Sequence, residues 1–177
     1  MIRDIIQTAV IVFDKREFTS CSGCPHCGGD VQGYDSRSKK FATIRDDGKE
    51  RIITVRVKRF TCKSCGRLCY ADNPFYPHIH IGSPIIDLFS SLSATMPASR
   101  AARIIDLAGI IVDRTTWRNY KGRKFPDVSV VEILGMRLPV SIVTLSNISA
   151  DSGEEGIPNS SEILAACGYP STHQVRG

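Results

Sequence analysis

Four cysteines in two short pairs are the residues of this chain whose types and spacing point most clearly to chemistry. Each pair has two residues between its cysteines and a glycine behind it, in Cys24-Pro25-His26-Cys27-Gly28 and Cys62-Lys63-Ser64-Cys65-Gly66. A turn of this kind aims two thiolates, and often its own N–H groups, at one metal ion. Two such turns complete a tetrahedral ligand set. The pattern therefore predicts one structural Zn²⁺ bound by Cys24, Cys27, Cys62 and Cys65.

Three other chemistries also use paired cysteines. Cys-Pro-His-Cys is the redox-active tetrapeptide of some thioredoxin-like oxidants, but here no hydrophobic strand leads directly into Cys24 and a second matching pair follows. Rubredoxin-like iron domains resemble short, acidic, aromatic-rich chains, whereas this chain has a net charge of +5. Structural disulfides are disfavoured because no secretory signal is visible. Zinc remains the expected metal.

Three further cysteines lie outside the two pairs. Cys21 precedes Cys24 by the same spacing, and Cys69 follows Cys65 by a slightly longer one. Either could replace a ligand or form a second cluster, but the glycine behind each inner pair favours the inner four. We read Cys21 and Cys69 as neighbours of the site, and Cys167 as an isolated, buried thiol.

The residues between the pairs have the pattern of a β-hairpin. Strands are expected over residues 31–44 and 51–62, because Asp46-Asp47-Gly48 between them is a strong tight-turn signal. Such a hairpin brings the two cysteine pairs together, which is the arrangement of a zinc ribbon.

The second expected strand has one apolar and one basic face. Val55 and Val57 alternate with Arg56 and Lys58. We expect Arg56, Lys58 and the following Arg59 to contact the phosphates of a nucleic acid, because binding there releases condensed counterions.

The distribution of charge supports a partner rich in phosphate. Residues 1–125 hold 21 Lys and Arg against 12 Asp and Glu, whereas residues 126–177 hold 2 against 6. The basic part is also the part with the cysteine pairs. A solvated surface is the plainer explanation of this surplus, but the motifs around it favour nucleic acid.

Three helices are expected after a stiff, proline-containing linker over residues 73–82. The first is predicted to begin at Ser83, its cap, and to end at Pro97. The second covers residues 99–108 and ends before Gly109. The third begins after Asp113, its cap, and ends near Gly122. Two short helices joined by a glycine-containing turn, the second dense in Arg, Thr and Asn, fit a helix-turn-helix. A plain helical bundle is the alternative.

The third helix carries the side chains that could read DNA. Arg can grip guanine or phosphate, Asn can read adenine, and Thr can contact phosphate or a thymine methyl. Trp117 and Tyr120 lie three residues apart and share the inward face, so Trp117 is expected in the core. The candidate DNA contacts on this helix are Arg114, Thr115, Arg118, Asn119 and Lys121.

The order of these parts resembles the N-terminal DNA-binding half of prokaryotic insertion-sequence transposases. The resemblance covers roughly residues 20–125 and lies in Val-Arg-Val-Lys-Arg-Phe-Thr-Cys at 55–62, the second cysteine pair, and Asp113-Arg114-Thr115-Thr116-Trp117-Arg118. In that family the ribbon and helix-turn-helix recognise transposon ends, and a separate RNase H-like domain performs the cutting step of DNA recombination. Residues 126–177 are too few for that domain, so we expect no catalytic centre and no enzyme activity.

The fold class expected is therefore α+β, with a small antiparallel zinc ribbon followed by a three-helix, helix-turn-helix-like module. Within residues 126–177, a strand is expected over 138–145 and a short helix over 163–166. The predicted parts are a docking segment (1–19), the ribbon (20–72), the linker (73–82), the helix-turn-helix (83–125) and an extension of unassigned role (126–177).

The function expected from these parts is zinc-dependent, sequence-specific DNA binding. The partners would be double-stranded DNA, as transposon ends or an operator, and a second copy of the chain or a full-length transposase. No segment has the length of a membrane span, and reduced thiols suit the cytoplasm. The alternatives are a stand-alone transcription regulator and a zinc-ribbon scaffold that binds RNA or protein.

Overall fold

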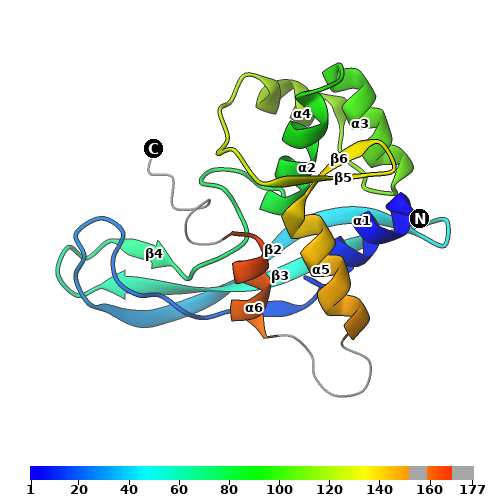
Figure 1. The fold of residues 1–177 in the computed structure, drawn as a ribbon. Helices are drawn as coiled ribbons and strands as arrows, with labels where there is room; N and C mark the ends of the chain where they lie inside the picture. The colour runs from blue at the N-terminus through cyan, green and yellow to red at the C-terminus, as the bar shows by residue number, and fades with distance from the viewer. Residues whose placement is uncertain (152–158, 169–177) are drawn as a thin grey trace.

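The computed structural model describes residues 1–151 and 159–168 and shows a mixed α and β architecture (Figure 1). A long hairpin extends from a body in which helices surround one of its ends. In chain order the described elements are α1 (Ile2–Ile11), β1 (Arg16–Phe18), β2 (Val31–Asp46), β3 (Lys49–Cys62), β4 (Leu68–Tyr70), α2 (Ser83–Ser93), α3 (Ala98–Leu107), α4 (Arg114–Lys121), β5 (Val130–Ile133), β6 (Met136–Pro139), α5 (Val140–Asp151) and α6 (Ser160–Ala166).

The predicted hairpin is present as β2 and β3, which pair in antiparallel fashion along their whole length. Its turn places Asp47 at φ 48° and Gly48 at φ 76°, the left-handed conformations that a type I′ turn needs and that Asp-Gly sequences favour. β1 pairs in parallel with β3, and β4 pairs with β3 nearer the cysteines. β2 is therefore an edge strand of the sheet.

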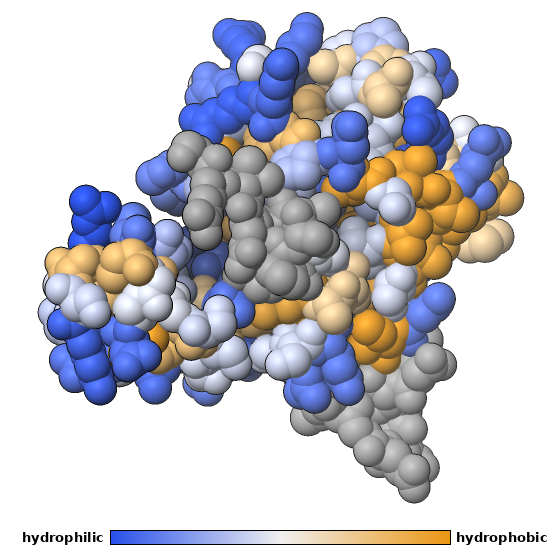
Figure 2. All heavy atoms as spheres, turned by 60° about the vertical axis from the view of Figure 1, so that its left-hand side comes forward, coloured by the Kyte–Doolittle hydropathy of each residue, from blue (hydrophilic) through white to orange (hydrophobic). Residues whose placement is uncertain are grey.

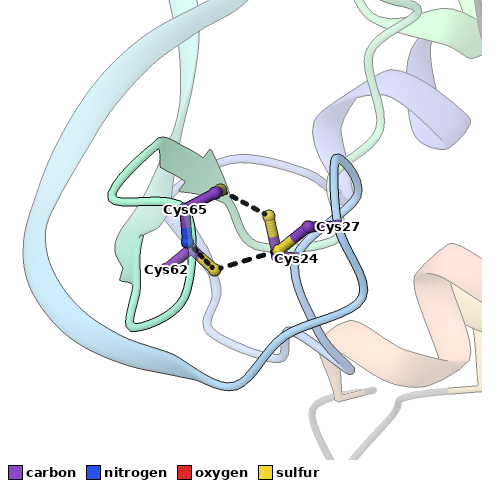
Figure 3. A group of neighbouring side chains, drawn as sticks. All are labelled: Cys24, Cys27, Cys62 and Cys65. Atoms are coloured by element: carbon purple, nitrogen blue, oxygen red, sulfur yellow. Dashed lines mark hydrogen bonds between the residues drawn. The ribbon is translucent and has the colours of Figure 1, made fainter.

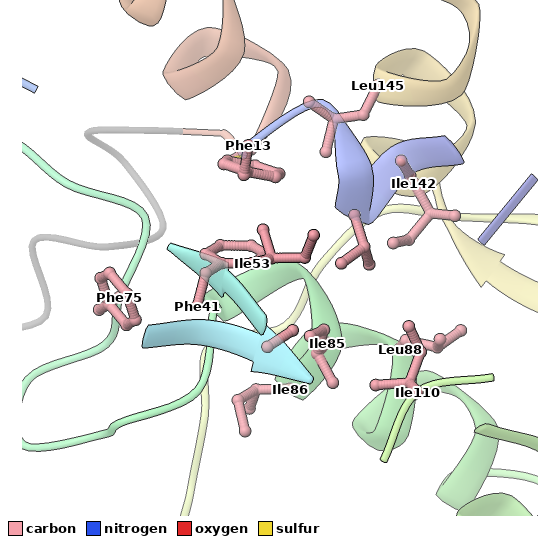
Figure 4. Packing of buried hydrophobic residues seen from close by; sticks show 14 of the residues in the cluster. Phe13, Phe41, Ile53, Phe75, Ile85, Ile86, Leu88, Ile110, Ile142 and Leu145 are labelled. Carbon is pink, nitrogen blue, oxygen red and sulfur yellow. The ribbon is translucent and has the colours of Figure 1, made fainter. Parts of the chain in front are cut away.

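The hydrophobic core lies around the half of the hairpin next to this turn (Figure 4). Phe41 and Ile53 are fully buried there, and the ring of Phe13 stacks on Phe41 with centroids 4.2 Å apart. Ile85 approaches from α2, and Ile142 from α5. Segments from both ends of the described chain thus close over the same strands.

The three predicted helices form as α2, α3 and α4, but α2 ends at Ser93, short of the predicted end at Pro97, and its start also differs. Ser83, predicted as the cap, is the first residue of the helix, and Gly82 occupies the cap position. A Cβ at residue 82 would lie 2.1 Å from the ring of Phe41, so a glycine lets α2 approach the strand. α4 begins as predicted, because the Asp113 carboxylate accepts a hydrogen bond from the N–H of Thr116 at 2.7 Å.

The connection between α3 and α4 is hydrogen-bonded to the outer edge of β2. The N–H of Arg45 donates to the carbonyl of Gly109 at 2.8 Å, and the N–H of Ile111 donates to the carbonyl of Thr43 at 2.8 Å. The Arg45 guanidinium also pairs with Asp106, near the end of α3, at 2.6 Å. These bonds hold the two helices against the sheet.

The strand predicted over residues 138–145 is wrong for most of its length. β6 ends at Pro139, and α5 begins at Val140. Ile142 and Leu145 are both fully buried, at a spacing of three residues that suits a helix and not a strand, whereas Leu138 is buried within β6. The short helix predicted over residues 163–166 is confirmed within α6.

A candidate metal centre and a candidate nucleic-acid interface

The four cysteines predicted as ligands come together where the two cysteine turns meet (Figure 3). All four Sγ atoms lie within 4.8 Å of one another. The Sγ atoms of Cys24 and Cys65 are 3.7 Å apart, and those of Cys27 and Cys62 are 3.4 Å apart. The set is close enough to hold one metal ion.

Each turn is closed by the glycine that follows its second cysteine. The N–H of Gly28 donates to the carbonyl of Cys24 at 2.8 Å, and the N–H of Gly66 donates to the carbonyl of Cys62 at 3.0 Å. These glycines have φ angles of 75° and 72°, which a residue with a Cβ rarely adopts. The trailing glycines of the sequence pattern therefore shape both turns in the same way.

Backbone N–H groups point at the sulfur atoms of Cys24 and Cys62 and favour their thiolate form. The N–H of His26 donates to Cys24 Sγ at 3.4 Å, and the N–H of Ser64 donates to Cys62 Sγ at 3.4 Å. The N–H groups of Cys65 and Ser64 lower the pKa of Cys62. Burial opposes ionisation of Cys24, but its hydrogen bonds prevail and lower its pKa to about 6. A thiolate is the form that binds a metal.

The two turns also pack directly on each other. The N–H of Lys63 donates to the carbonyl of Asp30 at 2.8 Å, which links the second turn to the strand that leaves the first. A Cβ at residue 29 would lie 2.6 Å from Ser64 Oγ, so Gly29 permits this contact. The relative position of the four sulfur atoms is thus set by backbone packing.

The other cysteines lie beside this group or far from it. Cys69 is buried next to Cys24 and Cys62, and burial raises its pKa to about 11, which favours the neutral thiol. Cys21 Sγ donates to the carbonyl of Gly23 at 3.4 Å. Among the described residues, the four-sulfur group includes neither of them. Cys167 is buried within the hydrophobic core, as predicted.

The hairpin has the alternation predicted for its second strand. Val55 and Val57 are buried in the core, whereas Arg56 is exposed and Lys58 half-buried on the opposite face. The strand pairing adds Lys40, opposite Thr54, to the same face. We call Lys40, Arg56 and Lys58 the hairpin basic face. In the described part of the chain, none of these three cations forms an ion pair.

Arg59, the third predicted phosphate contact of the hairpin, points to the other face of the sheet. Its Nε donates to Asp35 Oδ1 at 2.5 Å, and its Nη2 donates to Asp35 Oδ2. This bidentate pair raises the pKa of Arg59 and lowers that of Asp35. The charge of Arg59 is therefore largely balanced within the protein.

α4 exposes the polar side chains that the sequence singled out. Trp117 is 6% exposed, as predicted for a core residue, and its ring lies on Phe89 of α2. Because α4 is fixed on this side, its opposite face points to solvent. That face carries the exposed residues Arg114, Thr115, Arg118 and Asn119.

Lys121, at the end of α4, lines an open cavity of about 1000 Å³ between α2, α4 and β6. Arg123, Lys124 and Arg137 line it as well, against one carboxylate, Asp127. These three cations were not predicted as contacts from the sequence. Arg123 and Lys124 are adjacent in the sequence after Gly122, so a basic pair could have been predicted there. Arg137 is distant in the sequence and reaches the cavity only because of the fold.

A second cavity, of about 450 Å³, separates α4 from the edge strand β2. This cavity is lined by Lys40 of the hairpin basic face, by Thr116 of α4 and by Asp113, the N-cap of α4. The N–H of Thr116, with a smaller contribution from Lys40, lowers the pKa of Asp113. The hairpin basic face therefore reaches the N-terminal end of α4.

Comparisons with known proteins add no relative. No family model matches the chain, and neither a curated protein nor a solved structure matches it. Among the described residues, no helix combines the length and the apolar character that crossing a membrane requires.

Proposed function

We propose that this chain is a zinc-dependent DNA-binding protein that reads duplex sequence with α4. One observation carries the proposal. Arg114, Thr115, Arg118 and Asn119 are exposed along one face of a helix whose opposite face is anchored by Trp117 on Phe89. A helix presented in this way can enter a major groove with its base-reading side chains outward.

Zinc is the metal that suits the four cysteines. A tetrahedral site with Zn–S bonds of about 2.3 Å has S···S edges of about 3.8 Å. The Cys24–Cys65 and Cys27–Cys62 separations of 3.7 and 3.4 Å are near that length. Four thiolate ligands leave no open coordination position, so the ion would stabilise the fold and not act as a catalyst.

The order of α3 and α4, two short helices joined by a connection that contains Gly109, supports a helix-turn-helix. Their connection is longer than the shortest turns of that motif because part of it runs along β2. α4 would be the recognition helix, with its N-terminal residues nearest the base edges.

Cations on both sides of α4 support phosphate contacts beside the base contacts. The hairpin basic face reaches one end of the helix, and the cavity lined by Lys121, Arg123 and Lys124 adjoins the other. Figure 2 shows hydrophilic side chains gathered both on the projecting hairpin and over the helices at the top. Such contacts position a protein on a duplex without reading its sequence.

The order of a cysteine-clustered hairpin before α3 and α4 supports recognition of transposon ends as the specific role. Selection of bound sequences from a random duplex pool tests the proposal. We expect enrichment of one motif, and loss of that enrichment after Arg118→Ala. Recovery of unrelated sequences by the folded, metal-loaded protein would reject sequence-specific reading. If the selected motif matches inverted repeats beside the coding sequence, a transposase is favoured. If the motif occurs in the promoter of the protein's own gene, a transcription regulator is favoured.

A further inference from the structure

The face of the sheet that holds Arg59 carries an exposed aromatic surface near the metal centre. Tyr34 of β2 is 65% exposed and Tyr70 of β4 is 49% exposed, on the two strands that flank β3. A bulge in β2 between Gly33 and Asp35 leaves Tyr34 as the extra residue. We call Tyr34, Tyr70 and the intervening Arg59 the tyrosine platform.

Arg59 joins the two tyrosines across the sheet. Its guanidinium carbon lies 5.5 Å from the centroid of the Tyr34 ring, and its register partner on β4 is Tyr70. Asp35 holds the guanidinium from a third side with two hydrogen bonds. The platform is therefore ordered before any ligand arrives, which reduces the entropy lost on binding.

The charges around the platform favour an anionic partner. Arg37, with its side chain 63% exposed, lies 3.6 Å from Asp35 at the edge of the platform. The Lys39 ammonium lies 5.9 Å from the Tyr70 ring and 4.1 Å from the Phe75 ring. Arg37, Lys39 and Arg59 together outnumber Asp35, so the surface joins exposed rings to a net positive charge.

We propose that the tyrosine platform binds single-stranded nucleic acid, with unpaired bases stacked on Tyr34 and Tyr70 and the adjoining phosphates near Arg37 and Lys39. Exposed aromatic rings in a basic groove bind single strands because every base offers a flat face for stacking. A duplex hides those faces. The platform also lies on the opposite side of the hairpin from Arg56 and Lys58. This site is thus separate from the hairpin basic face, although Lys39 also lines the cavity beside α4.

Fluorescence anisotropy with labelled ten-nucleotide oligo(dT) and oligo(U), beside a labelled duplex, tests the proposal on the zinc-loaded full chain. Each of Tyr34→Ala and Tyr70→Ala should weaken single-strand binding by about 5- to 100-fold, as expected for the loss of one stacked base. Tyr34→Phe should retain most of the affinity because it keeps the ring. The matched control is Ile52→Ala, which truncates an exposed side chain of β3 near the opposite end of the hairpin.

The two binding surfaces can be told apart in the same assay. Arg118→Ala should lower duplex affinity and leave single-strand binding unchanged, while Tyr34→Ala should do the reverse. Equal affinity for oligo(dT) and oligo(U) would indicate that stacking alone holds the strand. A higher affinity for oligo(U) would indicate additional contacts to the ribose hydroxyl. If Tyr70→Ala also loses zinc, the result for the more exposed Tyr34 decides. No single-strand binding by the wild-type chain, or unchanged binding by Tyr34→Ala, would overturn the proposal.

Discussion

The ring of Trp117 lies flat on the ring of Phe89, with centroids 4.2 Å apart and planes 11° apart. This stack joins α4 to α2 at the base of the proposed recognition surface. Trp117→Ala should lower the free energy of unfolding by about 3–5 kcal/mol, because it removes a buried aromatic side chain and leaves a cavity. Denaturant titration checks this, with Trp117→Phe as the conservative control that retains stacking. A loss below about 1 kcal/mol would show that α4 is held by other contacts.

Arg118 and Asn119 should affect recognition without affecting stability. Each change to Ala should cost about 1–3 kcal/mol on the preferred duplex and much less on random DNA, because a lost base contact removes discrimination and leaves phosphate attraction. Both side chains are exposed, so the unfolding midpoint should stay close to that of the wild type. Titrations with both duplexes measure the difference. Equal losses on the two would make these residues phosphate contacts.

Metal content provides the most direct test of the cysteine group. Elemental analysis should find about one zinc per chain, and none after Cys24→Ala or Cys65→Ala. Structural zinc sites supply on the order of 10 kcal/mol of apparent binding free energy, so these variants should also unfold the end of the hairpin. Cys21→Ser is the matched control and should keep its zinc. Iron in place of zinc, or two zinc ions per chain, would contradict the assignment.

The salt dependence of duplex binding should separate the two faces of the hairpin. Arg56→Ala combined with Lys58→Ala should flatten the slope of log affinity against log salt by about two, because each cation that contacts a phosphate contributes about 0.9. Arg59→Gln combined with Asp35→Asn removes an internal ion pair on the other face and should leave that slope unchanged. The opposite result would place the duplex on the tyrosine platform.

Asp87 should make the protein less stable at high pH than at low pH. It is 1% exposed on α2, and burial raises its pKa to about 7 although the Tyr76 hydroxyl donates to its Oδ1. Well below pH 4 the carboxyl is neutral in both the folded and the unfolded state. Between pH 4 and pH 7 only the unfolded chain ionises freely, so the free energy of unfolding should fall by on the order of 4 kcal/mol and then level off.

The control for that prediction is a change that keeps the shape of the side chain. Asp87→Asn should remove most of the fall in stability between pH 4 and pH 8, whereas Asp4→Asn, at an exposed position, should retain it. Unfolding titrations at several pH values measure both variants. An unchanged profile in Asp87→Asn would mean that Asp87 ionises in the folded protein as readily as in the unfolded chain.

Local patterns predicted the cysteine turns, the hairpin and α4 because each depends on residues close together in sequence. The Asp113 cap and the glycines behind the cysteine pairs specify backbone geometry within a few residues. α5 was missed because its β-branched residues resemble a strand, and the contacts that make it helical come from distant segments. The pairing of Arg59 with Asp35 was hidden for a related reason, since a bulge at Tyr34 determines which residues face each other.

The hydrogen bonds that join residues 109 and 111 to β2 fix α4 at a defined distance from the candidate metal centre. α4 adjoins the strand near Ala42, and the cysteine turns meet it at Val31. Two bulges shorten this part of β2 to the length of the nine residue steps of β3 from Ile53 to Cys62, which is about 30 Å of extended chain. One turn of B-form DNA is about 34–36 Å long. A duplex lying along the hairpin would therefore present nearly the same side to both regions, and its protected footprint would extend about nine base pairs beyond the sequence that we propose α4 reads.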